Sequence, residues 1–381
     1  MIKRTVFESE HDMFRDSVRK FLTEEAVPYH AQWEKDGQVS RELWVKAGQH
    51  GYLCPTVPEA YGGVGADFRY NAVVDEEVAR LGLTGIGFGL HSDIAVPYIM
   101  AYGTEAQKQR YLPGCVSGEI VTAIAMTEPG TGSDLQGIQT SAVLDGAGEH
   151  YLLNGSKTFI TNGQMADLVI VVAKTNLGAG AKGTSLLLVE AGLDGFEKGQ
   201  NLEKIGMKAQ DTSELFFQDV KVPKDNLLGA EGMGFVYLMQ ELPQERLSVA
   251  LNAIAAAESI LEQTIAYVKE RKAFGRAIAS FQNTQFRLAE MSATLTMARV
   301  FVDKCLELHL NTQLDEVTAA KLKLLSTEIQ CDVIDECLQL HGGYGYMLEY
   351  PVARAFADAR VQKIYAGTNE IMKLIIGRSL V

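Results

Sequence analysis

Several features of other protein classes are missing from this 381-residue sequence. No run of apolar residues is long enough to cross a bilayer, so we expect no stable membrane insertion. The formal net charge of -13 disfavours a nucleic-acid partner, because the backbone of DNA or RNA would be repelled. The chain also has no G-x-G-x-x-G fingerprint between a strand and a helix. The nearest candidate, around Gly63 and Gly65, lacks the third glycine, which argues against a Rossmann site.

The cysteines are few and poorly spaced for a disulfide framework or a zinc site. There are five, an odd number, and no C-x-x-C pair occurs. We therefore expect no metal site and a reducing compartment. The N-terminal segment has no long apolar stretch and is too acidic for a transit peptide, so the expected location is cytoplasmic.

What the chain does contain is a change of pattern from helical to strand-like and back. Helical spacing marks residues 9–25, 76–83 and 91–102. Short β-branched and apolar runs typical of strands follow at 121–126, 141–144, 151–153, 168–173, 185–189 and 214–222. Long apolar stripes at steps of three and four then return at 247–268 and 288–305, as in a helix bundle.

This order predicts an α+β, mostly helical protein rather than a doubly wound sheet. We expect an N-terminal helical domain at 1–120, a central β-barrel or β-sandwich domain at 121–231, and a C-terminal helical domain at 232–381. A chain of this length has room for two or three such cores.

Two candidate binding motifs lie in the β region. In TEPGTGSD (127–134), glycines permit a tight path whose backbone N–H groups could hold a flavin edge or a pyrophosphate. A plain surface loop would have the same composition. In NGSKTFITNG (154–163), two Asn-Gly pairs bracket a strand, as in an ordinary hairpin. The alternative interpretation sets Phe159 and Thr161 beside a planar ring.

Two more candidates lie in the C-terminal region. Arg271 and Phe274 follow a long amphipathic helix and could clamp a pyrophosphate and an adenine, although a basic helix end is also common without a ligand. In QLHGGYGYMLEYP (339–351), two adjacent glycines permit close backbone approach, or simply end a helix. In IYAGTNEI (364–371), a threonine and a glutamate could bind a ribose or a phosphate.

These motifs together resemble the acyl-CoA dehydrogenase family over essentially the whole chain. PEAYGGVGAD (58–67) and KIGMKAQDTSELFFQDVKVP (204–223) extend the likeness beyond the four motifs. LPQERL (242–247), KAQDTSELFF and QLHGGYGYM are most similar to the long-chain branch. The resemblance implies a C-terminal four-helix domain, non-covalent FAD between it and the β domain, and a homotetramer in which a neighbouring subunit also touches each FAD.

The resemblance also assigns roles to particular residues. It implies that the isoalloxazine is lined within one subunit by Ile124, Met126, Thr127, Gly132, Ser133, Phe159 and Thr161, and that Thr368 and Glu370 help to hold the same FAD. It implies that FAD of the partner is reached by Arg271, Phe274, Gln339, Gly342 and Gly343. Ser133, Arg246, Ala366 and Gly367 would contact acyl-CoA.

The catalytic base departs from the common family pattern. Many members carry a glutamate just before the Gly-Thr of the last motif, where this chain has Ala366. The long-chain and isovaleryl branches carry the base in an earlier Glu-Arg pair, which corresponds to Glu245 and Arg246. We therefore predict Glu245 as the base, against the alternative of a solvated surface carboxylate. The resemblance implies that the Ala366 N–H, with a ribityl hydroxyl of FAD, binds the thioester oxygen, a role that needs no side chain.

The implied activity is α,β-dehydrogenation of acyl-CoA to trans-2-enoyl-CoA in fatty-acid β-oxidation. Electron-transferring flavoprotein would accept the electrons. Two alternatives remain open: an acyl-CoA oxidase that uses O₂, and a flavin-free scaffold that has kept the fold without the catalysis. The preferred acyl chain is also open, with long or medium straight chains favoured by likeness.

Overall fold

The strand Leu168–Lys174 (β4) is apolar on both faces, and this fixes where the layers of the protein lie. Leu168, Ile170 and Val172 face a core shared with the N-terminal helices. The alternate residues, Val169 and Val171 among them, face a second core enclosed by the sheet itself. Because successive side chains of a strand point to opposite faces, one continuous apolar run joins the helical layer to the β layer.

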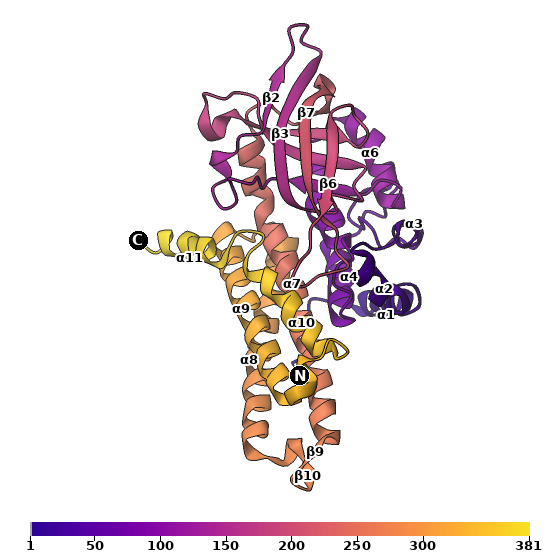
Figure 1. Cartoon of the computed structure of the whole chain (residues 1–381), viewed down its shortest axis with the longest axis vertical. Helices are drawn as coiled ribbons and strands as arrows, with labels where there is room; N and C mark the ends of the chain where they lie inside the picture. Colours follow the sequence, from indigo (N-terminus) through magenta and orange to yellow (C-terminus); the bar gives the residue numbers. More distant parts are fainter. Residues whose placement is uncertain (1) are drawn as a thin grey trace.

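The computed structural model describes residues 2–381, and its β region lies at one end of the longest axis (Figure 1). The remaining strands are β1 (Thr122–Ala125), β2 (Ser141–Leu144), β3 (His150–Thr161), β5 (Thr184–Glu190), β6 (Phe196–Asn201), β7 (Thr212–Pro223) and β8 (Leu227–Leu228). Their order in the sheet is β6-β7-β3-β2-β4-β5-β8, and β1 pairs with β4 in parallel.

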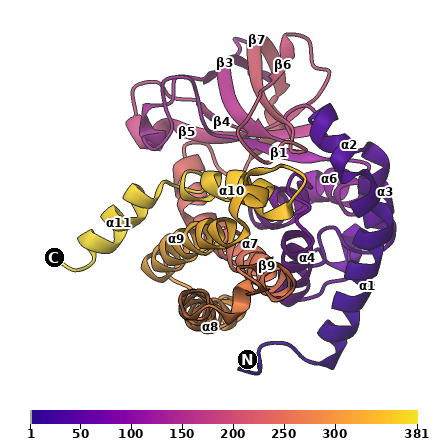
Figure 2. The same ribbon diagram turned by 60° about the horizontal axis from the view of Figure 1, so that its bottom comes forward.

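The N-terminal helices pack against one face of this sheet and lie largely below it in Figures 1 and 2. They are α1 (Ser9–Glu25), α2 (Val27–Asp36), α3 (Arg41–Gln49), α4 (Phe68–Arg80), α5 (Val96–Tyr102) and α6 (Glu105–Ser117). A single π-helical turn, η2 (Leu90–Ala95), runs directly into α5. Such turns are rare and often occur near functional sites.

The C-terminal helices form the elongated lower half of the molecule (Figure 1). They are α7 (Gly234–Glu270), α8 (Gln282–Leu310), α9 (Glu316–His341), α10 (Pro351–Ala359) and α11 (Asn369–Arg378), with a small hairpin of β9 (Lys272–Ala273) and β10 (Arg276–Ala277) at the tip. Leu247, Leu251 and Ile254 of the predicted stripe are buried in the bundle core. Helix α11 projects from the body in both views (Figures 1 and 2).

The predicted fold class, α+β and mostly helical with a central sheet, is confirmed. Helices give way to strands between Ser117 and Thr122 and return at Gly234, although the domain boundaries at 120 and 231 stay predictions. The predicted strand at 141–144 coincides with β2. The expected helix at 76–83 begins earlier, at Phe68 after the N-cap Asp67, and it ends at Arg80. Its first half was missed because polar residues such as Asn71 and Asp75 are buried among its apolar ones.

The predicted turn at the first Asn-Gly pair of NGSKTFITNG is wrong. Asn154 and Gly155 lie inside β3, where the register shifts at a bulge. Gly155 has φ +145°, and a Cβ there would lie 2.5 Å from Thr140 Oγ1. The glycine therefore serves a bulge and a close backbone approach rather than a hairpin turn.

Among residues 2–381, no helix is both long and apolar enough to cross a membrane, and no cluster of three metal-binding side chains occurs. All five cysteines are free, and four of them are buried. The thiols thus act as small core residues.

Candidate active site

Glu245 is buried inside the protein, although its sequence context would suit a surface residue. It lies on α7, two residues after Pro243, and its side chain packs against α5. There the hydroxyl of Tyr98 donates a 2.8 Å hydrogen bond to Glu245 Oε1. Tyr98 is itself fully buried. Oε2 accepts no hydrogen bond from any described residue, so this oxygen is free to take a proton.

The surroundings of Glu245 bring the pKa of its carboxyl close to neutral pH. Burial raises the pKa of its carboxyl from the ordinary value of 4.5 to about 7, since the charged form loses hydration. The Tyr98 hydrogen bond opposes the rise, whereas the charge of Glu241, one helical turn earlier, adds to it. A carboxylate with a pKa near the working pH is suited to proton abstraction.

The neighbouring Arg246 is a buried cation with unused donors. Its side chain is 2% exposed, and its Nε and Nη1 groups have no hydrogen-bond partner among the described residues. A Cβ placed on Gly367 would lie 3.9 Å from Arg246 Nη2. The fold therefore brings the Glu-Arg pair of α7 against the loop before α11, and it leaves N–H groups ready for a polar ligand.

That loop holds its backbone in an unusual conformation. Ala366 has φ +53° and Gly367 has φ +88°, both in the left-handed region. For alanine this conformation costs free energy and persists only where the surroundings enforce it. Neither the Ala366 nor the Gly367 N–H group donates a hydrogen bond to a described residue, so both are available to an oxyanion.

A buried lysine of α9 fixes the loop. Lys323 Nζ donates to the Gly367 carbonyl and to Asn369 Oδ1, both at 2.9 Å. Asn369 in turn donates to Thr327 Oγ1 at 3.1 Å and to Glu328 Oε1 at 2.9 Å. Burial, together with the charge of Arg246, lowers the pKa of Lys323 to about 8.

The predicted FAD residues of the last motif lie at the start of α11. Thr368 is the N-cap of this helix, and its Oγ1 accepts a 3.3 Å hydrogen bond from Ile371 N–H. Glu370 is exposed in the first turn. An N-terminal helix end of this kind favours an anionic group nearby.

A buried ion pair, Lys157 with Glu128, fixes the loop 127–134 at its start. Lys157 Nζ donates to Glu128 Oε1 at 2.8 Å and to the Met126 carbonyl at 3.0 Å. The Glu128 carboxylate also accepts from the N–H groups of Gln139 and Thr140. The Lys157 ammonium holds the pKa of Glu128 below its ordinary value in spite of burial, so the pair is ionised at neutral pH.

The outer part of this loop is open. Ile124 lies in the buried strand β1, Met126 and Thr127 are half-buried, and Gly132 and Ser133 are exposed. Gly130 and Gly132 do not have positive φ, and a Cβ on either would meet no atom within 4 Å. The prediction that their conformational freedom shapes the loop is therefore wrong; what they leave is space.

Phe159 presents an aromatic ring to the surface beside that loop. It lies in the second bulge of β3 with φ +59°, and 67% of its surface is exposed. Thr161, two residues further, is half-buried at the end of the strand. The bulge turns a large apolar ring outward, where a planar ligand can stack on it.

These groups fit FAD. The open loop edge, the exposed Phe159 ring and the Thr161 hydroxyl match a planar ring with polar edges. Arg246, whose Nη2 approaches Gly367, adds unpartnered donors at Nε and Nη1 for a polar ligand.

A second set of predicted residues lies far from the first. Arg271, Gln339, Gly342 and Gly343 line one hollow of about 610 Å³. The hollow lies beside the hairpin β9–β10, at the end of the bundle opposite the β region (Figure 1). Phe274, at the hairpin, is 95% exposed and has φ +52°. A single chain therefore does not bring these residues to Phe159.

Sequence reasoning missed four residues that shape the site: Tyr98, Glu128, Lys157 and Lys323. Each is a polar group buried in a helix, strand or loop. A lysine inside a mainly apolar helix or a Thr/Ile-rich strand is the one signal that could have indicated Lys323 and Lys157. Tyr98 gave no such signal, because a tyrosine in an apolar helix is ordinary.

Three family models match successive parts of the chain. They are the N-terminal domain of acyl-CoA dehydrogenase at residues 8–119, the middle domain at 123–220 and the C-terminal domain at 232–381.

Individual relatives agree with these models. The chain is 55% identical to the mitochondrial long-chain specific acyl-CoA dehydrogenase of Sus scrofa, over 99% of this chain and 88% of that protein. An acyl-CoA dehydrogenase structure from Geobacillus kaustophilus is 52% identical with a TM-score of 0.97, covering 99% of this chain and 100% of the other. An acyl-CoA dehydrogenase complexed with FAD from Bacillus anthracis is 33% identical with a TM-score of 0.92, covering 98% of this chain and 68% of the other.

Proposed function

Because this chain belongs to the acyl-CoA dehydrogenase family, we propose that Glu245 is the base of an FAD-dependent α,β-dehydrogenation of acyl-CoA thioesters. The observation that carries this assignment is the buried Glu245 carboxyl beside Arg246 and the Ala366 loop, with a pKa of about 7. The product is the trans-2-enoyl-CoA, and the reaction belongs to fatty-acid β-oxidation.

Bound FAD would supply the acceptor for the hydride that leaves the β-carbon. Phe159 and Thr161 would flank its ring, together with Ile124, Met126, Thr127, Gly132 and Ser133 of the neighbouring loop. Thr368 and Glu370 would contact it from α11. The Lys157–Glu128 pair keeps that loop in place at the Met126 carbonyl.

Glu245 takes the α-proton on Oε2, since Oε1 is held by Tyr98. The substrate carbonyl must be polarised at the same moment, because the α-proton of a thioester is only weakly acidic. The backbone N–H of Ala366 supplies this polarisation, and Lys323 holds the loop by its hydrogen bond to the Gly367 carbonyl. Arg246 and Ser133 contact the acyl-CoA beside it.

The test is Glu245→Gln, with Glu241→Gln as the matched control one helical turn away. Glu245→Gln should bind FAD and acyl-CoA yet reduce flavin at least about 1,000-fold more slowly in a single turnover, since an amide cannot take the proton. Glu241 is half-buried and bound to Tyr102, and its replacement should leave the flavin reduction within about tenfold of normal. Rapid reduction in Glu245→Gln would contradict the assignment.

The electron acceptor is part of the same proposal. Electron-transferring flavoprotein is expected, and an acyl-CoA oxidase that uses O₂ is the alternative. Stopped-flow reoxidation of the reduced enzyme in air, with and without the acceptor protein, separates them. Fast reoxidation in air alone would favour the oxidase, and a colourless preparation that binds no flavin would favour an inactive scaffold.

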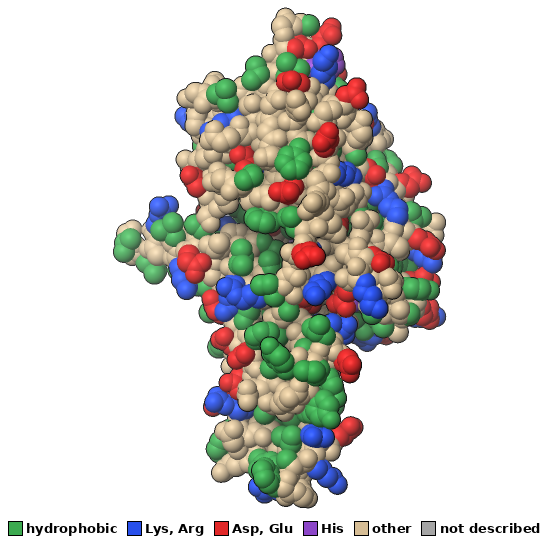
Figure 3. All heavy atoms as spheres, in the orientation of Figure 1, with side chains coloured by type: hydrophobic (Ala, Val, Ile, Leu, Met, Phe, Trp, Pro, Cys, Tyr) green, Lys and Arg blue, Asp and Glu red, His purple; other side chains and the backbone are tan. Residues whose placement is uncertain are grey.

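Assembly as a homotetramer is supported by surfaces of the bundle. Large apolar side chains are exposed on four of its helices: Phe286, Met297, Val300, Leu325, Phe356 and Leu374. Figure 3 shows apolar side chains spread over this half of the molecule. A partner's FAD reaching the hollow at Arg271, Gln339, Gly342 and Gly343 would explain why these residues lie far from Phe159. Sedimentation of wild type and Phe274→Asp measures both assembly and FAD retention.

The proposal also covers the length of the acyl chain in the substrate and the cellular compartment of the protein. Identity to a long-chain specific enzyme supports long straight acyl groups, and kcat/KM across acyl-CoA lengths tests this. Five free cysteines support a reducing compartment, with the cytoplasm as the specific expectation. The relative of Sus scrofa is named mitochondrial, so cell fractionation is the direct test.

A further inference from the structure

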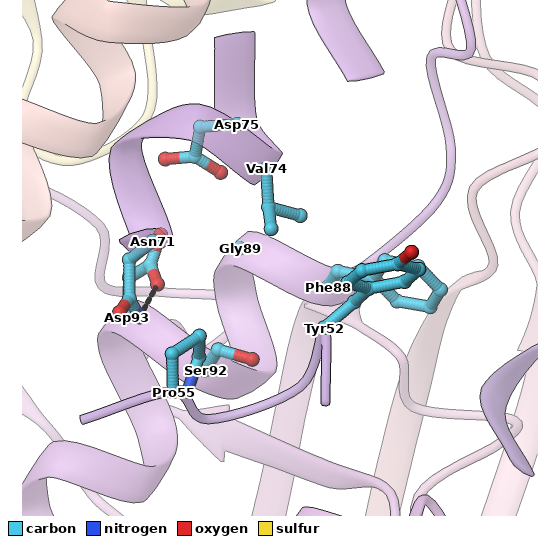
Figure 4. A pocket seen from close by; sticks show the side chains of 9 residues that line it. All are labelled: Tyr52, Pro55, Asn71, Val74, Asp75, Phe88, Gly89, Ser92 and Asp93. Carbon is cyan, nitrogen blue, oxygen red and sulfur yellow. Dashed lines mark hydrogen bonds between the residues drawn. The ribbon is translucent and has the colours of Figure 1, made fainter. Parts of the chain in front are cut away.

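Two carboxyl groups face each other in the interior, close to the proposed base. Asp75 comes from α4 and Asp93 from the π-helical turn η2, and both are buried (Figure 4). The Ser248 hydroxyl of α7 lies 2.6 Å from Asp75 Oδ2 and 3.1 Å from Asp93 Oδ2. Asn71 donates a 2.6 Å hydrogen bond to Asp93 Oδ1. Three elements therefore meet at one acid pair.

Counting protons shows that the pair must hold one. Ser248 has a single hydroxyl proton, so it cannot satisfy two carboxylates at once. Two unpaired negative charges bridged by one hydroxyl in a dry interior are strongly unfavourable. Burial and the charge of Asp93 raise the pKa of Asp75 well above its usual range, while burial also raises the pKa of Asp93. The pair therefore shares one proton, and Asp75 has the larger upward pKa shift.

The pair lies where the base and its hydrogen-bond donor are joined. Ser248 follows Glu245 by three residues on α7, and Gln244 directly precedes it. Gln244 Nε2 donates a 2.6 Å hydrogen bond to the backbone carbonyl of Asp93. The turn that carries Asp93 continues into α5, which carries Tyr98. The segment of α7 that carries Glu245 and the segment that carries Tyr98 are therefore both linked to the acid pair, each within a few residues of the contact.

We propose that Asp75 and Asp93, sharing one proton, are positioning residues that hold α7 against η2 and thereby set the hydrogen bond from Tyr98 to Glu245. The inference rests on the proposed role of Glu245 as the base. The ionisable groups that face Asp75 are Asp93 and Tyr365, and those that face Glu245 are Tyr98, Glu241 and Arg246.

Close packing makes the arrangement sensitive to small changes. A Cβ on Gly89 would lie 2.7 Å from Asp75 Oδ1 and 3.5 Å from Asp93 Oδ2 (Figure 4 shows Gly89 beside both). Gly89→Ala therefore acts as a wedge that leaves both carboxyl groups in the protein. Ser248→Ala removes only the bridging hydroxyl, and it is mild enough to fold if larger changes are not.

The experiment is a double-mutant cycle on the FAD-loaded enzyme, read by the pH midpoint of kcat/KM. Gly89→Ala and Ser248→Ala should each move the midpoint to higher pH and reduce kcat/KM at pH 7 by about 10- to 100-fold, because the Tyr98 hydrogen bond lowers the pKa of Glu245. In a Tyr98→Phe background the same changes should add little, since the contact they set is already gone. Asp75→Asn, which copies the protonated acid, should restore the wild-type midpoint that Asp75→Ala loses.

Additive effects with Tyr98→Phe, or an unchanged midpoint in both Gly89→Ala and Ser248→Ala, would overturn the inference. So would an Asp75→Asn variant as impaired as Asp75→Ala. Glu245→Gln, measured in parallel, distinguishes failure of the proposed base from failure of the proposed positioning role. Normal flavin reduction in Glu245→Gln would contradict the proposed function. Slow reduction in Glu245→Gln, combined with additive effects in the double-mutant cycle, would contradict only the positioning role.

Discussion

Tyr98 and Glu245 come from helices 147 residues apart in sequence, yet their side chains form a buried hydrogen bond of 2.8 Å. The bond orients the carboxylate and leaves one of its oxygens free. It also lowers the pKa of Glu245, while burial works in the opposite direction and prevails. The contact with Tyr98 therefore positions the proposed base and moderates the rise in its pKa that burial causes.

The activity should rise with pH around neutrality. Glu245 must be ionised to take a proton, and its pKa is about 7 in the free protein. A plot of kcat/KM against pH reports the free enzyme, so it should climb through a midpoint near that value. Tyr98→Phe removes a bond that favours the ionised form, so its midpoint should move to higher pH, with activity largely recovered in alkaline buffer. Tyr102→Phe, next to Glu241, is the matched control, and an equal shift there would contradict a specific role for Tyr98.

Replacing the base should stabilise the protein at alkaline pH. The folded-state pKa of Glu245 is raised above its unfolded value, so folding is penalised as pH rises from about 4.5 through about 7. A shift of this size corresponds to about 3 kcal/mol at pH values above it. Glu245→Gln should therefore unfold in urea with a higher free energy than wild type at pH 8.5 and with nearly the same free energy at pH 4.5. A stability difference that does not depend on pH would argue against a raised pKa.

Lys323 should contribute to the affinity for ligands that have a thioester carbonyl and contribute little to the affinity for ligands that lack one. Lys323→Met removes the contacts to Gly367 and Asn369 that hold Ala366 in its left-handed conformation. We expect affinity for an acyl-CoA thioester to fall by about tenfold, the value of one lost charge-assisted hydrogen bond. A CoA thioether of equal length lacks the carbonyl, and its affinity should stay within about twofold. Equal losses for both ligands, measured by calorimetry, would show a general disruption instead.

The Lys157–Glu128 pair should be sensitive to the loss of one partner and tolerant of the loss of both. Lys157→Met leaves a buried, unpaired Glu128 under the loop 127–134, at a cost of about 3 kcal/mol or more. The loop should loosen and FAD should dissociate more easily, which flavin fluorescence measures. Adding Glu128→Gln removes the stranded charge, so the double variant should regain much of the stability. A double variant less stable than Lys157→Met would contradict this account.

Local pattern was enough for much of the architecture. Strand β4 reads as an uninterrupted apolar run, and α7 and α8 carry stripes at steps of three and four, so their type follows from burial alone. The sequence pattern did not predict the bounds of an element where a helix is buried on most sides, or where a bulge lies in place of a turn. Helix α4 is enclosed on nearly every side, and Asn154 with Gly155 lies within β3 instead of ending it.

The sequence by itself determined the chemistry available: a Glu-Arg pair on α7, an alanine where a carboxylate would otherwise lie, and a Gly-rich loop after β1. It could not determine that Glu245 would be buried against Tyr98, that Arg246 would reach Gly367, or that Lys323 would hold the loop from α9. These facts depend on packing between helices distant in sequence. Burial, hydrogen bonding and nearby charge set a pKa, and all three exist only once the chain has folded.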